Sequence, residues 1–185
     1  MQQRSFGDGP PVSLFTLGTM RALQAPDQML MVLRAAHAAG VNHLETAPAY
    51  GPAESFLGEA LTQLHSEGIQ PAGHGWVVTS KLLPGLSLDE GRAALRGSLE
   101  RLGIERLDNL AIHGLNLDSH LNWALHGEGA RLIDWALNSG TVSQVGFSSH
   151  GSNALIHQAI ESQRFRFCCL HLHLLDPTRM PLAQL

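Results

Sequence analysis

Four side chains in this sequence are of the types that transfer a proton to or from a bound molecule. They are the carboxylate of Glu45, the phenol of Tyr50, the ammonium of Lys81 and the imidazole of His113. A phenol with an ordinary pKa of about 10 is a useful acid at neutral pH only where a cation stabilises its phenolate form. Lys81 can supply that cation, a carboxylate can hold the ammonium in place, and an imidazole can bind a substrate oxygen. The set predicts general acid catalysis.

Composition singles out two of these four residues. Tyr50 is the one tyrosine of the chain, and Lys81 is the one lysine among twelve lysine and arginine residues. Lysine and arginine replace each other on a solvated surface, but not where an ammonium must tune the pKa of a neighbour. The single lysine therefore indicates a specific role.

Short apolar segments alternate with segments of helical periodicity along the chain. Strands are predicted at 12–17, 41–46, 76–79 (running on into Lys81), 107–112, 142–147 and 165–172. Five helices are predicted between them, beginning near Asp27, Pro52, Ser87, Ala130 and Ser152. The helix after Ser87 has the clearest signals, because Glu90 completes a capping box and Gly103 ends the helix.

This alternation predicts an α/β fold with parallel strands and right-handed crossovers. From the second strand to the fifth the repeat is roughly 30 to 35 residues, as in a (β/α)8 TIM-type barrel of about 250 residues. No linker divides the chain, so we expect one incomplete barrel domain over residues 1–185, with about six strands and five helices. An open doubly wound sheet also fits, but the first strand is followed by Leu17-Gly18-Thr19-Met20 and not by a glycine-rich dinucleotide turn.

Ligand sites in such folds lie at the C-terminal ends of the strands. Glu45, Tyr50, Lys81 and His113 follow the second, third and fourth predicted strands, so they should meet at one end of the barrel. Other polar residues follow the first, fifth and sixth strands: Gly18, Thr19, Ser148, Ser149, His150, His171 and His173.

Composition excludes several other classes of protein. A net charge of −4 and 15% charged residues fit neither a disordered acidic tail nor a basic nucleic-acid-binding arm. The two cysteines, Cys168 and Cys169, are adjacent, so they form neither a disulfide framework nor a zinc ribbon. No apolar run reaches the 18 residues of a membrane span, and residues 1–9 lack the apolar core of a signal peptide. We expect a cytoplasmic globular domain without nucleic-acid or membrane partners.

The segment Asn42-His43-Leu44-Glu45-Thr46-Ala47-Pro48-Ala49-Tyr50-Gly51 resembles the signature of the aldo/keto reductases, usually written Asp-Thr-Ala-x-x-Tyr-Gly. Further segments resemble the family in the same order. They are Phe6-Gly7 with Leu17-Gly18-Thr19, then Ser80-Lys81, then Leu107-Asp108-Asn109-Leu110-Ala111-Ile112-His113, and Val145-Gly146-Phe147-Ser148-Ser149. The resemblance covers essentially the whole chain but not the C-terminal part of the family's barrel, its last two strands included.

The resemblance implies an oxidoreductase that reduces a small aldehyde or ketone with NADPH. It implies that Tyr50 is the general acid, that Lys81 lowers its pKa, that Glu45 anchors Lys81 and that His113 orients the carbonyl. Cofactor contacts are implied for Gly18, Thr19, Ser148 and Ser149.

Two residues depart from the family pattern. Glu45 replaces the usual aspartate, as in a branch that often appends an iron–sulfur domain, for which this chain has no cysteine cluster. Ser149 stands where the family generally has an asparagine that contacts the nicotinamide carboxamide, and a serine could still form a hydrogen bond there.

Two alternative hypotheses remain. His113, His150, His171 and His173 could ligate a metal, as in a barrel hydrolase, since His171 and His173 would share a strand face. This hypothesis gives the Tyr50–Lys81 pair no function. The chain could instead be a non-catalytic, regulatory relative.

The early end of the pattern carries an expectation of its own. Without closure, the first and sixth strands would keep unpaired backbone groups. We therefore expect the 185 residues alone to self-associate through open barrel edges and to bind NADPH weakly.

Overall fold

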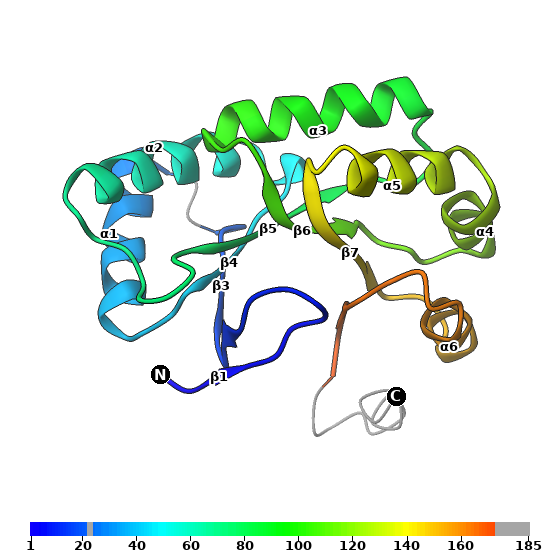
Figure 1. The fold of residues 1–185 in the computed structure, drawn as a ribbon, viewed down its shortest axis with the longest axis horizontal. Helices are drawn as coiled ribbons and strands as arrows, with labels where there is room; N and C mark the ends of the chain where they lie inside the picture. Colours follow the sequence, from blue (N-terminus) through cyan, green and yellow to red (C-terminus); the bar gives the residue numbers. More distant parts are fainter. Residues whose placement is uncertain (22–23, 173–185) are drawn as a thin grey trace.

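The computed structural model describes residues 1–21 and 24–172 (Figure 1). Its main element is a parallel sheet with the strand order β3-β4-β5-β6-β7-β8. These strands are Thr16–Gly18, His43–Glu45, Val77–Leu82, Leu107–Ile112, Val142–Ser149 and Cys168–Leu170. The predicted α/β fold with six parallel strands, a partial barrel, is confirmed.

Six helices connect the strands in the described part of the chain. They are α1 (Pro26–Ala38), α2 (Ala53–Ser66), α3 (Leu88–Leu102), α4 (Asp118–His126), α5 (Glu128–Asn138) and α6 (Asn153–Glu161), with one 3-10 turn, η1 (Pro48–Tyr50). Figure 1 shows the helices following one another around the outside of the sheet. The main core lies between the sheet and this arc, and it includes the fully buried Leu44, Leu57 and Leu110. No helix among the described residues is long and apolar enough to cross a membrane.

Two predicted elements were wrong in their bounds. The strand predicted at 12–17 is divided: β2 (Val12–Ser13) pairs antiparallel with β1 (Gln3–Arg4), and the parallel strand β3 begins at Thr16. The Ser13 hydroxyl donates to the Phe15 carbonyl at 2.6 Å, which turns the backbone between the two strands. The strand predicted at 165–172 is confined to Cys168–Leu170.

The count of five helices was also wrong, because α4 was not predicted. This helix has nine residues, and no side chain caps its N-terminus at Leu117. Gly127 ends α4 and also begins α5. Without an N-cap or a long apolar period, the sequence carries little signal for this helix.

The barrel interior contains a chain of hydrogen bonds between polar side chains that sequence analysis missed. His43 joins Thr16 and Thr79, with 2.8 Å on each side, and Asn109 donates to Thr79 at 3.0 Å. Gln144 then donates to Asn109 at 2.6 Å, so this series of hydrogen bonds extends from β3 to β7. Burial lowers the pKa of His43 to about 4, although Asp108 opposes the shift. The neutral imidazole therefore links strands β3, β4 and β5.

The capping box of α3 gives a stability prediction. Ser87 Oγ accepts from Glu90 N at 3.3 Å, and Ser87 N donates to Glu90 Oε2 at 2.9 Å. Ser87→Ala should lower the free energy of unfolding by about 1 kcal/mol, because it leaves a backbone donor of the first turn without its side-chain acceptor. Urea unfolding measures the loss. Ser5→Ala, at an exposed serine, should change it by less than about 0.5 kcal/mol. An equal effect of the two substitutions would contradict the role of the cap.

Candidate active site

A cavity of about 870 Å³ opens at the C-terminal ends of the strands. All four residues predicted to transfer a proton line it, together with Ser148. Its other lining residues include Phe6, Leu83, Pro84, Leu170, Asn116, His120, His150, His171 and Cys169. The structure thus brings together predicted site residues that are up to 103 positions apart in the sequence, from Glu45 to Ser148.

Tyr50, Lys81 and Glu45 are in mutual contact in this cavity. Lys81 Nζ donates to the Tyr50 hydroxyl at 2.9 Å and forms an ion pair with Glu45 Oε1. The Tyr50 hydroxyl lies 3.3 Å from the same Glu45 oxygen. Lys81 Nζ also donates to the Thr46 carbonyl at 3.1 Å, and its side chain is only 3% exposed. Four directed contacts therefore hold the ammonium against the phenol.

Local backbone structure sets these positions. Lys81 is the fifth of the six residues of β5, which is buried along its whole length. Glu45 is the last residue of β4, and the turn η1 begins at Pro48 and ends at Tyr50. Pro48 occupies the first turn, where its missing N–H costs no hydrogen bond. Gly51 leaves this turn with φ of 61°, a conformation that favours glycine.

Burial shifts the titration of the cavity residues. It lowers the pKa of Lys81 to about 8. The ammonium form therefore still predominates at pH 7, and the contact with the Glu45 carboxylate favours that form further. Burial, and then the nearby Cys169, raise the pKa of Tyr50, so the phenol keeps its proton at neutral pH.

His113 lies beside the phenol at the end of β6. The rings of Tyr50 and His113 meet edge to face, with centroids 5.7 Å apart. Burial, followed by the charges of Lys81 and His150, lowers the pKa of His113. A neutral imidazole donates one hydrogen bond, which is what orienting a carbonyl oxygen requires.

The four predicted cofactor residues fall in different surroundings. Ser148 lines the cavity, and its Oγ accepts from Gly114 N at 3.0 Å. Within the described residues its O–H has no acceptor, so it can donate to a ligand. Ser149 is 1% exposed and does not line the cavity; it donates to the Leu115 carbonyl at 2.6 Å and accepts from Gly151 N at 3.0 Å.

Gly18 and Thr19 lie beside Glu45 but do not line the cavity either. A Cβ added to Gly18 would be 3.4 Å from Glu45 Oε2, and Thr19 N donates to the Glu45 carbonyl at 2.9 Å. The Thr19 side chain is fully buried, and its hydroxyl has no hydrogen-bond partner within the described residues.

Asn116, after β6, is a cavity residue that sequence analysis missed. Its Oδ1 accepts from His150 N at 2.7 Å. Because a backbone N–H must face the amide oxygen, Nδ2 points the other way, toward Gly114, and lies 3.4 Å from where a Cβ of Gly114 would be. No sequence signal marks this residue. It lies in the loop after β6, which meets the loop after β7 only in the folded structure.

The histidines proposed as metal ligands do not form a metal site in the described part of the chain. There, no group of three or more His, Cys, Asp or Glu side chains is placed to hold a metal ion. The rings of His150 and His171 are 6.4 Å apart. His171 follows β8, which ends at Leu170, and His173 lies outside the described residues.

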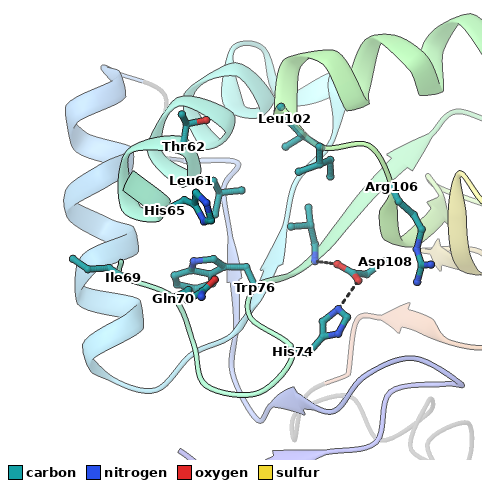
Figure 2. A pocket seen from close by; sticks show the side chains of 13 residues that line it. Leu61, Thr62, His65, Ile69, Gln70, His74, Trp76, Leu102, Arg106 and Asp108 are labelled. Carbon is teal, nitrogen blue, oxygen red and sulfur yellow. Dashed lines mark hydrogen bonds and ion pairs between the residues drawn. The ribbon is translucent and has the colours of Figure 1, made fainter. Parts of the chain in front are cut away.

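A second cavity, of about 390 Å³, lies at the opposite ends of β5 and β6 (Figure 2). Apolar side chains such as Leu61, Trp76 and Leu102 form much of its wall. Its carboxylate, Asp108, is engaged by His74 at 3.0 Å and by Val78 N at 2.9 Å, as Figure 2 shows. None of the predicted site residues lines it.

Comparisons with known proteins agree with the fold and the motifs. The model of the aldo/keto reductase family matches residues 15–175. An aldo-keto reductase of Mycolicibacterium vanbaalenii is 30% identical over 125 residues, and a 6-dehydroglucose reductase of Novosphingobium aromaticivorans is 31% identical over 141 residues. Each match covers 68% of this chain, but only 38% and 43% of the two relatives.

Solved structures show the same architecture. AKR11C1 from Bacillus halodurans, in its holo form, has a TM-score of 0.79 at 21% identity over 100% of this chain and 63% of its own. Bombyx mori AKR2E4, in complex with NADP, has a TM-score of 0.78 at 21% identity over 99% of this chain and 63% of its own. The chain belongs to the aldo/keto reductase family, and it matches about two thirds of the length of these solved structures.

Proposed function

We propose that the chain is an NAD(P)H-dependent oxidoreductase that reduces the carbonyl of a small aldehyde or ketone to an alcohol. The observation that carries this proposal is the contact of Tyr50 with Lys81 at 2.9 Å, with Glu45 on the same ammonium, at the wall of a large cavity. In this proposal residues 1–185 are a single, incomplete aldo/keto reductase-like barrel domain.

The cavity residues fit a nicotinamide group. A carboxamide offers a carbonyl acceptor, and the wall offers the O–H of Ser148 and the Nδ2 of Asn116 as donors. The hydroxyl of Ser149 is already hydrogen-bonded to the Leu115 carbonyl and to Gly151 N. Asn116 therefore replaces Ser149 as the residue that donates to the nicotinamide carboxamide. Gly18, at the end of β3, and Thr19, directly after it, support Glu45. A relative of the same fold is solved with NADP, which supports NADPH as the cofactor.

The chain's own residues would then handle the proton. A bound NADPH supplies hydride to the carbonyl carbon. Tyr50 donates its hydroxyl proton to the carbonyl oxygen as negative charge develops there. Lys81, held by Glu45 and by the Thr46 carbonyl, stabilises the phenolate that remains. His113 donates a hydrogen bond that orients the same oxygen.

One relative and the lining of the cavity together indicate the class of substrate. One relative is named a 6-dehydroglucose reductase, which is a reductase of a sugar-derived carbonyl. The cavity here mixes apolar wall residues such as Phe6 and Leu170 with the side chains of Asn116 and His120. This mixture suits a small carbonyl compound that carries further polar groups.

Direct titration with NADPH, followed by its fluorescence, tests the proposed cofactor and the contact at Asn116. The unaltered chain should bind NADPH weakly, as expected of an incomplete barrel. Asn116→Asp should raise Kd by a further factor of about 10, because the substitution keeps the acceptor for His150 N but removes the amide donor. Asn122→Asp makes the same chemical change on the exposed face of α4 and should leave Kd unchanged. Failure of the unaltered chain to bind would contradict the proposed function and favour a non-catalytic relative. Equal binding by Asn116→Asp would contradict only the contact.

The pKa of Lys81 gives a pH prediction. The protonated ammonium is the form that stabilises the phenolate, so its deprotonation removes that help. Since burial lowers this pKa to about 8, kcat/KM should begin to fall as the pH rises through about 8. A pH profile at saturating NADPH measures this fall. A rate that is constant or rising up to pH 10 would contradict the role of the ammonium.

A further inference from the structure

Glu54 is a fully buried carboxylate that the catalytic proposal does not use. It lies in the first turn of α2 and is 0% exposed. Its Oε2 is bound by Arg101 of α3 through Nε at 2.8 Å and Nη2 at 2.7 Å. Its Oε1 accepts a hydrogen bond of 2.5 Å from the hydroxyl of Ser80. A buried carboxylate is costly unless both oxygens are satisfied, and here they are.

The position of this contact in the chain links the two catalytic elements. Glu54 follows Tyr50 by four residues, with only the turn from η1 into α2 between them. Ser80 directly precedes Lys81 on β5 and points to the opposite side of the strand, toward the helices. The Glu54–Ser80 bond therefore ties the segment that carries the phenol to the strand that carries the ammonium.

Arg101 fixes the orientation of the Glu54 carboxylate that accepts from Ser80. Since the guanidinium occupies Oε2 from α3, the carboxylate cannot rotate away from Ser80 without breaking a paired charge. The guanidinium also donates to Ser98 Oγ at 3.3 Å, on its own helix. Ser98 is as buried as Ser80, each at 1% exposure, but no side-chain hydrogen bond joins it to β5 in the described part of the chain. Both serines belong to the hydrogen-bond network of Glu54 and Arg101. Ser80 lies on β5, the strand that carries Lys81, whereas Ser98 lies on α3.

We propose that Glu54 and Ser80 are positioning residues that set the distance between the Tyr50 hydroxyl and the Lys81 ammonium. This inference rests on the proposed function. Neither residue touches the substrate or the cofactor. Both act through the 2.9 Å contact between Lys81 and Tyr50.

The experiment compares Ser80→Ala with Ser98→Ala. Ser80→Ala should lower kcat by about 10-fold and leave the Kd of NADPH unchanged, because a small displacement of the acid from its cation weakens only the chemical step. Ser98→Ala, which removes an equally buried hydroxyl from the same network, should keep kcat within about twofold. Glu54→Gln should keep much of the activity, since its amide oxygen still accepts from Ser80, but it should be less stable in urea because the ion pair with Arg101 is lost.

Tyr50 provides a readout that does not depend on turnover, because it is the one tyrosine of the chain. Tyrosinate absorbance at high pH therefore reports Tyr50 alone. Its titration should move to higher pH in Ser80→Ala, where the phenolate loses the hydrogen bond from Lys81 Nζ, and should stay in place in Ser98→Ala. An unshifted titration together with unchanged kcat in Ser80→Ala would overturn the inference. Absence of NADPH-dependent reduction by the unaltered chain would instead overturn the proposed function.

Discussion

Tyr50→Phe is expected to lower kcat by about 10²-fold or more while the Kd of NADPH stays the same. The substitution removes one oxygen and keeps the aromatic ring that packs against His113. Only the proton donor to the carbonyl oxygen is lost, so the change falls on the chemical step and not on cofactor binding.

Two measurements separate this loss from damage to the fold. NADPH titration and urea unfolding of the variant should both match the unaltered chain, since the half-buried hydroxyl contributes only hydrogen bonds at the cavity wall. Turnover by the phenylalanine variant within a fewfold of the original would mean that another group delivers the proton.

Lys81→Arg should be nearly as damaging, although it preserves the charge. Lys81 is 3% exposed and is fixed by Tyr50, Glu45 and the Thr46 carbonyl. A planar guanidinium is wider than an ammonium and cannot reproduce these contacts around a single nitrogen. We expect a loss in kcat on the order of 10²-fold, measured in the same assay.

A matched substitution shows whether the effect belongs to this position. Arg131→Lys makes the reverse exchange at an exposed cation that pairs with Glu128, outside the Glu54 network, and it should keep kcat within about twofold. Full activity of Lys81→Arg would mean that position 81 needs only a positive charge to pair with Glu45. It would contradict the specific role inferred for the single lysine.

Sequence reasoning located the proton-transferring residues of the cavity wall because strand ends are local features. Glu45, Lys81 and His113 each follow a short apolar segment, and parallel pairing then brings them to one edge without further information. Ser148 follows the same rule. The order of the strands in the sheet could therefore be predicted from the alternation of apolar and helical segments alone.

What sequence reasoning missed depends on contacts between distant segments. Asn116 becomes a cavity residue because its amide oxygen pairs with His150 N, which is 34 residues away. The burial of Ser149 depends on Leu115, and the buried pair of Glu54 with Arg101 joins two helices. The polar chain through His43 was missed because an imidazole within a strand has no pattern that separates it from an exposed one.

The most direct test of the proposed reaction is the fate of a labelled hydride. The protein is incubated with NADPH that carries deuterium at both positions of nicotinamide C4, together with a small aldehyde, and the alcohol is analysed by mass spectrometry. We predict that the alcohol carries one deuterium on the former carbonyl carbon and that Tyr50→Phe forms it far more slowly. Absence of alcohol, or an alcohol without deuterium on that carbon, would contradict the assignment of this chain as an NADPH-dependent carbonyl reductase.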